Sequence, residues 1–407
     1  MRIGLLSCSF APEVTGIGPY SSELAQALAE RGHDVRVVTT FPFYPTWVPS
    51  VPPGTILYRR ERYGRVRVTR CRIYVPRKPN SFKRVCHELS WLFAATPVVL
   101  TQLKSVDVWL VVSPAFGSAV LGSCLTRLFR SRAHLHIQDV VPDVALESGQ
   151  IAHPWVRHCA AFSARWTYRG YRSCSVLSDG MERALRRYIH ADWKGRIFLA
   201  PNWSRNLADV DKTALPEELK ERSYVLFSGS FGRKQELSTL VEAASILEKR
   251  GGPLIVVVGD GPGRELIRTA KANLVWLGLV TDRTYSALVR NALAGLVTLV
   301  PGMSNSVVPS KLVGYLAAGR PVVVAADSSS EAVRIVTAEK CGIAIAPGRP
   351  DLLANAVMQL RDDLRGRESM SASGRAFAQL HLAKAPIVDR IEEALGRLVG
   401  LERMTDS

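Results

Sequence analysis

The order strand, loop, helix, strand occurs at the start of the chain and again after residue 223, and this repetition constrains the fold more than any other feature. The apolar run 1–9 leads into a Gly/Pro loop, an amphipathic helix over 21–31 and a strand over 35–40. Such an opening is typical of a doubly wound parallel sheet, in which ligands bind beyond the carboxyl ends of the strands. The first half therefore predicts one Rossmann-like domain, with further strands at 66–70, 108–112, 134–138, 173–177 and 196–200.

The second half repeats the pattern with a strand over 224–228, a helix over 237–250 and a strand over 254–258. The glycine-rich turn 259–263 follows that strand directly. A second Rossmann-like domain is predicted, with later strands at 274–277, 294–299, 321–325 and 342–345.

These patterns predict an α/β protein of two domains, because 407 residues are too many for one ordinary core. We expect the domains to span 1–205 and 224–407, joined by a polar linker over 206–223. The final helical pattern, 387–401, either closes the second domain or packs back on the first.

The positive charge is concentrated in the first half. The formal net charge is +17, and residues 1–205 hold 28 Lys/Arg against 13 Asp/Glu, whereas 206–407 hold 25 against 23. A basic half predicts an anionic partner, either a polyanion or an anionic membrane surface, with nucleic acid as the competing explanation. The basic part shows no helix-turn-helix, zinc-finger or RNA-binding motif, so we expect no nucleic acid partner.

Cysteine usage and apolar run lengths indicate a compartment. The seven cysteines are scattered and form no C-x-x-C pair, which is typical of a reducing cytoplasm. Residues 1–15 show no signal-peptide pattern, and the longest apolar-rich stretch, 89–103, is shorter than the ~20 residues that span a bilayer. We therefore expect a cytoplasmic protein that is soluble or peripheral.

One segment of the second half predicts an anion site. Pro309 and Ser310 suit the first turn of a helix, whose free N–H groups and positive dipole end attract anions, and Lys311 adds a full charge. Gly319 can stop the helix, and 322–324 continues as a buried strand. A diphosphate fits at this helix start, although an ordinary βαβ helix without a ligand has the same pattern.

Five motifs follow one another over most of the chain: the glycine loop 9–20, then 134–139, 200–203, 227–232 and 259–262. Together they resemble family 4 glycosyltransferases of bacterial exopolysaccharide and lipopolysaccharide pathways, in particular the subgroup that makes colanic-acid-like polymers. The resemblance implies the GT-B architecture, in which two Rossmann-like domains face one another across a cleft. It also implies metal-independent transfer from a nucleotide sugar bound by the C-terminal domain to an acceptor bound by the N-terminal domain.

The chain departs from the pattern of this family at two places. Family members commonly carry two glutamates separated by seven residues, and Ser306 and Gly314 stand at the matching positions. Ser230 stands where an arginine is frequent, with Arg233 and Lys234 following. The glutamate roles of the family therefore cannot be transferred to this chain.

The predicted donor site combines glycines, which let a backbone approach a phosphate, with cations that neutralise a diphosphate. A plain βα turn explains the first glycine pair equally, and solvated surface charge is the usual alternative for the cations. Glu331 follows three serines, so it either touches the donor's ribose or sugar, as a carboxylate does in similar enzymes, or sits in the first turn of a helix. The predicted donor-binding residues are Gly16, Gly18, Gly229, Arg233, Lys234, Gly261, Lys311, Leu312 and Glu331.

Asp139 and His136 are the candidate catalytic residues. Asp139 ends a predicted strand, where a carboxylate can accept hydrogen bonds from sugar hydroxyls or orient an acceptor. His136 alternates onto one face of that strand with His134 and suits a structural role equally, and Asp143 is predicted to form a turn. We find no Asp-x-Asp metal motif in a convincing loop and no ligand-spaced histidine cluster, so no metal or cofactor is expected.

A basic segment precedes an aromatic and apolar helix pattern in the first half. Residues 59–84 carry eleven Lys/Arg against Glu61 alone. A basic and aromatic surface of this kind can lie on anionic lipid and so reach a lipid-linked acceptor. The predicted acceptor and membrane residues are Arg77, Lys78, Lys83, Arg84 and Trp91.

The sequence thus predicts a retaining glycosyltransferase of the hexosyltransferase type, peripheral at the inner face of the cytoplasmic membrane. It would move a sugar from a UDP- or GDP-sugar to a lipid-linked saccharide in exopolysaccharide or lipopolysaccharide biosynthesis. Two alternatives stay open. One is a catalytically reduced GT-B protein that binds within a polysaccharide assembly, which Ser306 and Gly314 favour; the other is a GT-B sugar-nucleotide epimerase, which would need no acceptor.

Overall fold

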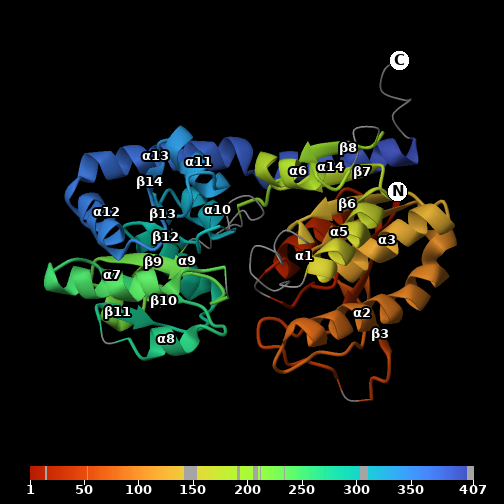
Figure 1. The fold of residues 1–407 in the computed structure, drawn as a ribbon, viewed down its shortest axis with the longest axis horizontal. Helices are drawn as coiled ribbons and strands as arrows, with labels where there is room; N and C mark the ends of the chain where they lie inside the picture. The colour runs from red at the N-terminus through yellow and green to blue at the C-terminus, as the bar shows by residue number, and fades with distance from the viewer. Residues whose placement is uncertain are drawn as a thin grey trace. The chain divides into compact units, whose positions relative to one another are not determined.

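The computed structural model describes residues 1–13, 16–52, 54–141, 154–189, 193–204, 210, 212–232, 234–270, 272–302 and 310–400. The chain divides into two compact units. One comprises Met1–Pro201 and the chain from Ala385 onward, and the other comprises Asn202–Lys384. Each unit has a central, mainly parallel sheet with helices packed on it (Figure 1), so the predicted α/β class with two parallel-sheet domains is confirmed.

The first unit contains an eight-stranded sheet that is parallel except at one edge, where β3 and β4 form an antiparallel pair. Most residues of the interior strands are buried, which explains why a strand such as VWLVVS reads as an apolar run. The edge strand β3 was not predicted, because its sequence YRRERY has no apolar alternation and its residues are largely exposed. In spatial order the strands are β3 (Tyr58–Tyr63), β4 (Val66–Cys71), β2 (Asp34–Thr40), β1 (Arg2–Leu6), β5 (Val108–Ser113), β6 (Ala133–Ile137), β7 (Ser173–Val176) and β8 (Arg196–Leu199).

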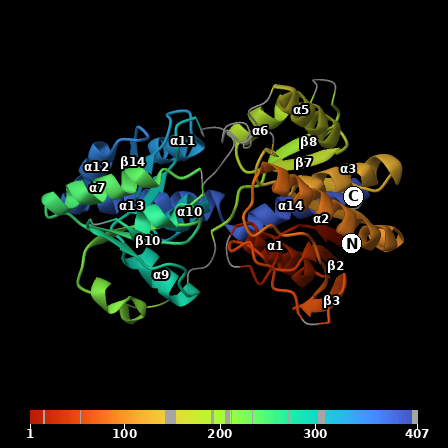
Figure 2. The same cartoon turned by 60° about the horizontal axis from the view of Figure 1, so that its bottom comes forward.

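Three helices of the first unit pack on one another: α2 packs on α3, as Figure 2 shows, and α3 packs on α5. The helix α2 is the longest of them and carries Pro97 in its interior, where the apolar-rich stretch was noted in the sequence. The helices of this unit within the described residues are α1 (Gly18–Glu30), α2 (Ser81–Gln102), the short η1 (Leu103–Ser105), α3 (Phe116–Leu128), α5 (Pro154–Tyr168), α6 (Asp179–Arg186) and the final α14 (Lys384–Val399).

The final helix α14 packs on the first unit, not on the second. The guanidinium of Arg31, at the end of α1, pairs with Asp389 at 2.6 Å and with Glu392. Nε2 of His33 lies 2.7 Å from the carboxylate of Glu392. Of the two arrangements that the sequence left open, the structure has the one in which the chain returns to its starting unit.

The second unit contains a six-stranded sheet in which all neighbours run parallel. Its strands in spatial order are β11 (Leu274–Trp276), β10 (Leu254–Val258), β9 (Tyr224–Ser228), β12 (Gly295–Thr298), β13 (Val322–Ala325) and β14 (Gly342–Ile345). Its helices among the described residues are η2 (Lys212–Ala214), η3 (Glu217–Leu219), α7 (Leu237–Lys249), α8 (Arg264–Arg268), α9 (Asp282–Asn291), α10 (Ser310–Ala317), α11 (Glu331–Ala338), α12 (Pro350–Asp362) and α13 (Leu364–His381).

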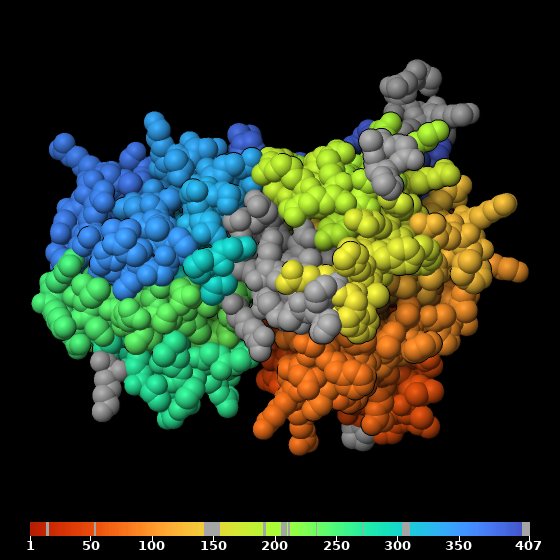
Figure 3. Space-filling view, viewed as in Figure 1, coloured from red at the N-terminus to blue at the C-terminus, as the bar shows by residue number. Residues whose placement is uncertain are grey.

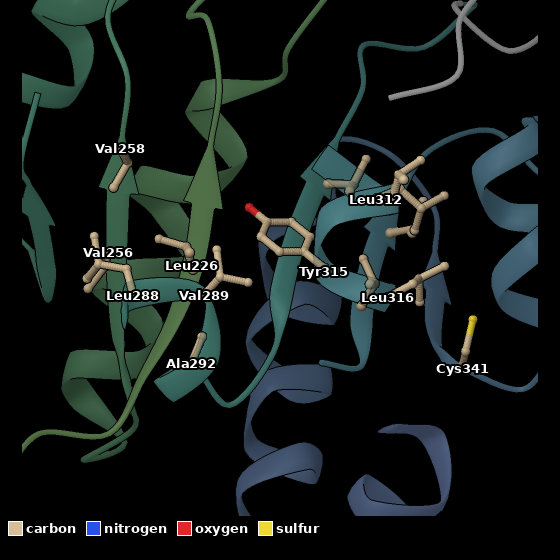
Figure 4. Packing of buried hydrophobic residues seen from close by; sticks show 14 of the residues in the cluster. Leu226, Val256, Val258, Leu288, Val289, Ala292, Leu312, Tyr315, Leu316 and Cys341 are labelled. Atoms are coloured by element: carbon tan, nitrogen blue, oxygen red, sulfur yellow. The ribbon is translucent and has the colours of Figure 1, made fainter. Parts of the chain in front are cut away.

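Helix α10 is fixed in this unit by the ring of Tyr315, which is fully buried and whose hydroxyl points toward β9 (Figure 4). Its Oη lies 2.9 Å from Oγ of Ser228. Gly295 in β12 leaves the space for the ring, because a Cβ at this position would lie 2.1 Å from a Tyr315 carbon. The packing therefore holds the start of α10 next to the end of β9.

The segment predicted as a linker is only partly one. Within 206–223, the short helices η2 and η3 belong to the second unit, and Leu215 and Leu219 are buried in its core. The polar composition of this segment concealed these two anchoring side chains.

Candidate functional site

The ammonium group of Lys311 is buried at the start of α10, against the end of β9. Nζ lies 3.5 Å from the centroid of the Phe227 ring and donates a hydrogen bond of 2.7 Å to Oε1 of Gln235. Burial lowers the pKa of Lys311 well below its usual value. No ion pair within the described residues includes Lys311, so no carboxylate of those residues balances this charge. A desolvated cation of this kind favours the binding of an anion.

Two glycine loops come together beside Lys311. A Cβ at Gly229 would lie 3.3 Å from Cε of Lys311, and a Cβ at Gly259 would lie 1.9 Å from the carbonyl oxygen of Gly229. A Cβ at Gly261 would lie 2.9 Å from the amide nitrogen of Phe231. All three glycines have positive φ, at 133°, 139° and 152°. Only residues without a side chain allow the two loops to approach in this way.

The amides of all three glycines are used within the protein, and that of Gly259 donates to the carbonyl of Gly278 at 2.8 Å. The N–H of Gly229 donates to the carbonyl of Val258 at 2.9 Å, and that of Gly261 donates to the side chain of Asp260 at 2.7 Å. Gly229 and Gly261 therefore bring the loops together and present Lys311, but they do not offer free donors to a ligand. Ser230, by contrast, is exposed, and its amide donates to no residue in the part of the chain that the structure describes.

The other predicted donor residues have different outcomes. Glu331 is nine-tenths buried as the first residue of α11, and its Oε1 accepts a hydrogen bond of 2.7 Å from Arg334. The side chain of Leu312 is 1% exposed in the apolar core, which leaves only its backbone to contact a donor, and its predicted role stays a prediction. Lys234 is half-buried in the same loop as Gln235, and Arg233 lies outside the described residues, as does Ser306.

Two polar groups near this sheet edge were missed in the sequence analysis. Gln235 supplies the only hydrogen-bond acceptor that Nζ of Lys311 has within the described residues. Oγ1 of Thr298, the last residue of β12, is buried without a hydrogen-bond partner among those residues. Neither has a sequence signal, since both acquire their position from the meeting of separate strands. At Gly314, a position where the resembled family carries a glutamate, α10 presents no side chain.

The first unit has its own polar edge, beginning with Glu13 in the loop after β1. Oε1 of Glu13 accepts hydrogen bonds of 3.0 Å from the amides of Phe43 and Tyr44. Oε2 is buried without a partner among the described residues, and burial raises the pKa of this carboxyl. Gly18 begins α1 against this carboxylate, since a Cβ there would lie 3.0 Å from Cβ of Glu13.

The other predicted glycine of this loop, Gly16, has a φ of 67° and lies beside the ring of Tyr44. A left-handed backbone at this position favours glycine, so the turn requires it whether or not a ligand binds. Its predicted contact with a donor stays a prediction.

A second carboxylate, Glu88 on α2, reaches the start of α3. Its Oε2 accepts a hydrogen bond of 2.9 Å from the amide of Gly117, and burial raises its pKa to about 7. Burial raises the pKa of the Cys8 thiol most, and the negative charges of Glu88 and Glu13 raise it further. Both carboxylates therefore lie near Cys8, just beyond the end of β1. Glu88 was not among the predicted site residues, because it lies in the basic and apolar segment that was predicted to face a membrane.

The prediction that His136 is catalytic is wrong. Both of its ring nitrogens are bound in a buried chain of side chains, with Nδ1 at 2.8 Å from Oγ of Ser175 and Nε2 at 2.7 Å from the amide nitrogen of Gln138. Ser175 also contacts Nε2 of His134, whose Nδ1 contacts Ser173, each at 2.8 Å. Burial lowers the pKa of His134 to about 3 and that of His136 to about 4. Both rings are neutral and structural.

Asp139, the other candidate, is half-buried just beyond the end of β6. This is the carboxyl edge of the sheet, on which Glu13 and Glu88 also lie. Its catalytic role stays a prediction, and Asp143 lies outside the described residues.

The outer face of α2 carries an apolar stripe formed by Phe82, Val85, Leu89 and Phe93, with exposed fractions between 46% and 74%. The spacing of three or four residues places these side chains on one face of the helix. Of the predicted basic residues, Arg77, Lys78 and Arg84 are exposed and Lys83 is half-buried, all before or within the first turns of α2. The surface of α2, in orange, and that of α5, in yellow, appear on the same side of this unit (Figure 3).

The prediction that Trp91 contacts the acceptor or the membrane is wrong. It is 0% exposed, and its indole N–H donates a hydrogen bond of 2.8 Å to Oγ of Ser118 on α3. It lies on the inner face of α2 with Ala95, so it cannot contact lipid. The helix α5 carries the exposed aromatic residues that the sequence analysis overlooked, Trp155, Phe162 and Trp166.

In the described parts of the chain, no group of three or more His, Cys, Asp or Glu side chains is arranged to hold a metal ion. No helix in those parts is long and apolar enough to cross a membrane.

Comparison with known proteins identifies the class. A glycosyl transferase 4-like domain matches residues 15–203, and a domain of the glycosyl transferases group 1 matches residues 222–363. The chain belongs to the family 4 glycosyltransferases, which have the GT-B fold, and it is thus a glycosyltransferase. The expectation drawn from its motifs is confirmed.

Among its relatives is the colanic acid biosynthesis glycosyl transferase WcaI of Escherichia coli (strain K12), with 30% identity over 350 residues, or 81% of this chain and 84% of that protein. Among solved structures, sucrose-phosphate synthase from Thermosynechococcus elongatus has a TM-score of 0.75 at 17% identity, covering 98% of this chain and 100% of that one. Anabaena HepE in complex with UDP-glucose has a TM-score of 0.69 at 15% identity, with the same coverage.

Proposed function

We propose that this protein is a retaining, metal-independent glycosyltransferase that moves a sugar from a UDP- or GDP-sugar to a lipid-linked saccharide of an exopolysaccharide or lipopolysaccharide pathway. The observation that carries the proposal is the buried cation of Lys311, which has no carboxylate partner among the described residues and lies where two glycine loops meet. A nucleoside diphosphate supplies the missing negative charge. Two further facts support this donor: HepE has been crystallised with UDP and with UDP-glucose, and the relative WcaI is named for colanic acid biosynthesis.

In this proposal the second unit binds the nucleotide. Lys311 neutralises the diphosphate as it departs, and the amide of Ser230 donates to one of its oxygens. Preorganised donors lower a barrier most where charge develops in the transition state. The bond from the sugar's anomeric carbon to the diphosphate oxygen breaks, and a bond to the acceptor oxygen forms on the same face. The acceptor's proton passes to the leaving diphosphate, so the step needs no protein base.

The first unit binds the acceptor in this proposal. Asp139, Glu13 and Glu88 lie at the carboxyl edge of its sheet, and carboxylates accept hydrogen bonds from sugar hydroxyls. Oε2 of Glu13 has no partner among the described residues, so a hydroxyl donor would satisfy it. An unpaired buried acceptor costs ~1–3 kcal/mol, which such a hydroxyl would recover.

The acceptor's lipid would be reached through the stripe on α2. Large apolar side chains beside Arg77, Lys78 and Arg84 can enter the interface of an anionic membrane while the cations bind its headgroups. Peripheral binding at the inner face of the cytoplasmic membrane follows from this part of the proposal.

The donor part is tested by thermal shift with UDP, GDP and their common sugars, because a ligand that binds the folded state raises its melting temperature. Stabilisation by one nucleotide in the wild type, lost in Lys311→Met and retained in the matched control Lys249→Met, supports the proposal. Lys249 is an exposed lysine at the end of α7. The absence of any nucleotide effect would reject it in favour of a binding protein.

The transfer part is tested by incubating the stabilising nucleotide sugar with a lipid-linked saccharide extract. Mass spectrometry detects the added sugar, and NMR of the product gives its anomeric configuration. An inverted configuration would disprove the retaining mechanism, and conversion of the donor to its epimer without an acceptor would show an epimerase.

A further inference from the structure

The first unit contains a cavity of about 510 Å³ that opens between the edge of its sheet and the end of α2. Four arginines line it: Arg36 from β2, Arg60 and Arg62 from β3, and Arg67 from β4. We call this cavity the arginine pocket. Three of the four belong to the basic segment that the sequence analysis assigned to a membrane surface.

Strand register brings these arginines onto one face of the sheet. Arg67 is directly opposite Arg36 in the parallel pair β2–β4 and directly opposite Arg62 in the antiparallel pair β3–β4. Arg60 is opposite Thr69, two residues along the same face. Like charges that face one another across strands destabilise a sheet. An anion bound to the three guanidinium groups in this row would therefore reduce their mutual repulsion.

The protein supplies only part of that negative charge. Asp34 accepts from Arg36 at 3.2 Å and also pairs with Arg67. Glu61, the only acidic residue lining the pocket within the described chain, is engaged at 2.6 Å by Arg70. Arg60 and Arg62 form no ion pair with any described residue.

Two buried polar atoms in the lining also have no partner among the described residues. One is Nε of Arg36, whose N–H group is a donor, and the other is Oε1 of Gln102, at the end of α2. A ligand with an anionic oxygen and a hydroxyl group would satisfy both, because the oxygen accepts from Arg36 and the hydroxyl donates to Gln102. Charged residues on an edge strand also block unwanted strand pairing, but this explains Arg60 and Arg62 only, not the inner Arg36.

The arginine pocket is separate from the site described above. Arg36 is the third residue of β2 and Arg67 the second of β4, so the pocket lies toward the amino ends of these parallel strands. Asp139, Glu13 and Glu88 lie at the opposite, carboxyl edge.

We propose that the arginine pocket binds the phosphate group of a hydroxyl-bearing phosphate ester. Arginine pairs with phosphate in a bidentate manner, and several guanidinium groups around one cavity suit its charge. The volume exceeds what a single phosphate needs and accommodates a glycerol phosphate. The ester has two sources with the same chemistry, a free metabolite or the headgroup of phosphatidylglycerol. The inference is independent of the donor and acceptor assignments.

The test compares two double variants of the full chain. Arg60→Gln with Arg62→Gln removes from the pocket the two cations that form no ion pair with a described residue. The control variant, Arg59→Gln with Arg65→Gln, removes the same charge from the same hairpin. Arg59 is an exposed residue of β3 on the opposite face of the sheet, and Arg65 is an exposed residue of the turn. Glycerol 1-phosphate binding is measured by calorimetry, and vesicles of phosphatidylcholine with and without phosphatidylglycerol are measured by co-sedimentation.

The pocket variant is expected to bind at least tenfold more weakly than the control variant. If the pocket variant selectively loses binding of glycerol 1-phosphate, the ligand of the pocket is a soluble ester. A selective loss for phosphatidylglycerol vesicles, without binding of the soluble probe, assigns the headgroup. Equal binding by the two variants in both assays would overturn the proposal. UDP binding measured on the same samples reports on the donor site separately.

Discussion

Replacing Lys311 by methionine tests whether the charge of Lys311 serves ligand binding or the stability of the fold. The substitution preserves the length of the side chain and removes its charge. The folded protein loses the hydrogen bond from the charged ammonium to Gln235, roughly 1.5–3 kcal/mol, and the contact with the Phe227 ring, about 1 kcal/mol. It regains the cost of desolvating an ammonium group, which is several kcal/mol when no carboxylate repays it. We therefore expect stability that does not fall and rises by up to about 2 kcal/mol.

The same substitution should weaken nucleotide binding. A hydrogen bond to a charged group contributes roughly 1.5–3 kcal/mol, so the dissociation constant for the nucleotide rises about tenfold to about 150-fold. Stability and affinity thus change in opposite directions. Chemical denaturation gives the first quantity, and calorimetric titration with the nucleotide gives the second.

The pH dependence of stability provides a further check on Lys311. Because its pKa is lower in the folded state than in the unfolded state, the unfolded chain binds more protons between the two values. The free energy of unfolding therefore rises with pH across that window, and Lys311→Met removes this contribution to the slope. If the variant instead loses about 2 kcal/mol or more and binds the nucleotide as the wild type does, Lys311 is a structural residue and the argument is wrong.

Three further outcomes are expected. Gly295→Val should lower the free energy of unfolding of the second unit by about 1–3 kcal/mol in a urea titration, because its side chain would overlap the ring of Tyr315. His134 and His136 should stay neutral in ¹⁵N NMR spectra at pH 5, and stability should fall by up to about 2.7 kcal/mol per pH unit from pH ~6.5 toward 4, as the unfolded chain takes up two protons that the folded chain excludes. Phe82→Ser with Phe93→Ser should reduce binding to phosphatidylglycerol vesicles at least tenfold in co-sedimentation, because two exposed rings no longer enter the lipid.

Matched controls decide each of these outcomes. Gly396→Ala on α14, where a Cβ meets nothing within 4 Å, should leave stability unchanged or slightly higher, and an equal loss at both glycines would contradict the packing argument. Leu380→Ser on α13 removes an equally exposed apolar side chain from the second unit and should leave vesicle binding intact. Imidazolium signals at pH 5 would contradict the neutral histidine chain.

The architecture was predictable because most buried parallel strands are apolar along much of their length. Runs such as 108–112 and 254–258 have this character whatever they pack against, and glycines between strand and helix show where the loops lie. The strand β3 was not predictable, since an edge strand with exposed arginines lacks both an apolar run and alternation. Leu215 and Leu219 were not predicted as core residues for a similar reason, because the segment around them is polar.

The site was only partly predictable, because residue type does not reveal which way a side chain points. Lys311 was found from its place at a helix start, but its partner Gln235 comes from another strand connection. Trp91 was assigned to the outer face of α2, although Trp91 and Phe93 are two residues apart and point to different sides of the helix. Glu88 gained its raised pKa from an approach to α3 that only the folded chain contains.

The return of α14 to the first unit has a consequence for synthesis of the chain. Arg31 and His33 leave the ribosome early, whereas their partner Glu392 follows only after the whole second unit, Asn202–Lys384, has been made. At about 5–20 residues per second, roughly 10–40 seconds separate β8 from the helix that completes its unit. The surface of the first unit that α14 covers is therefore exposed while the second unit is made and folds. A nascent chain stalled before residue 385 should engage chaperones through that surface.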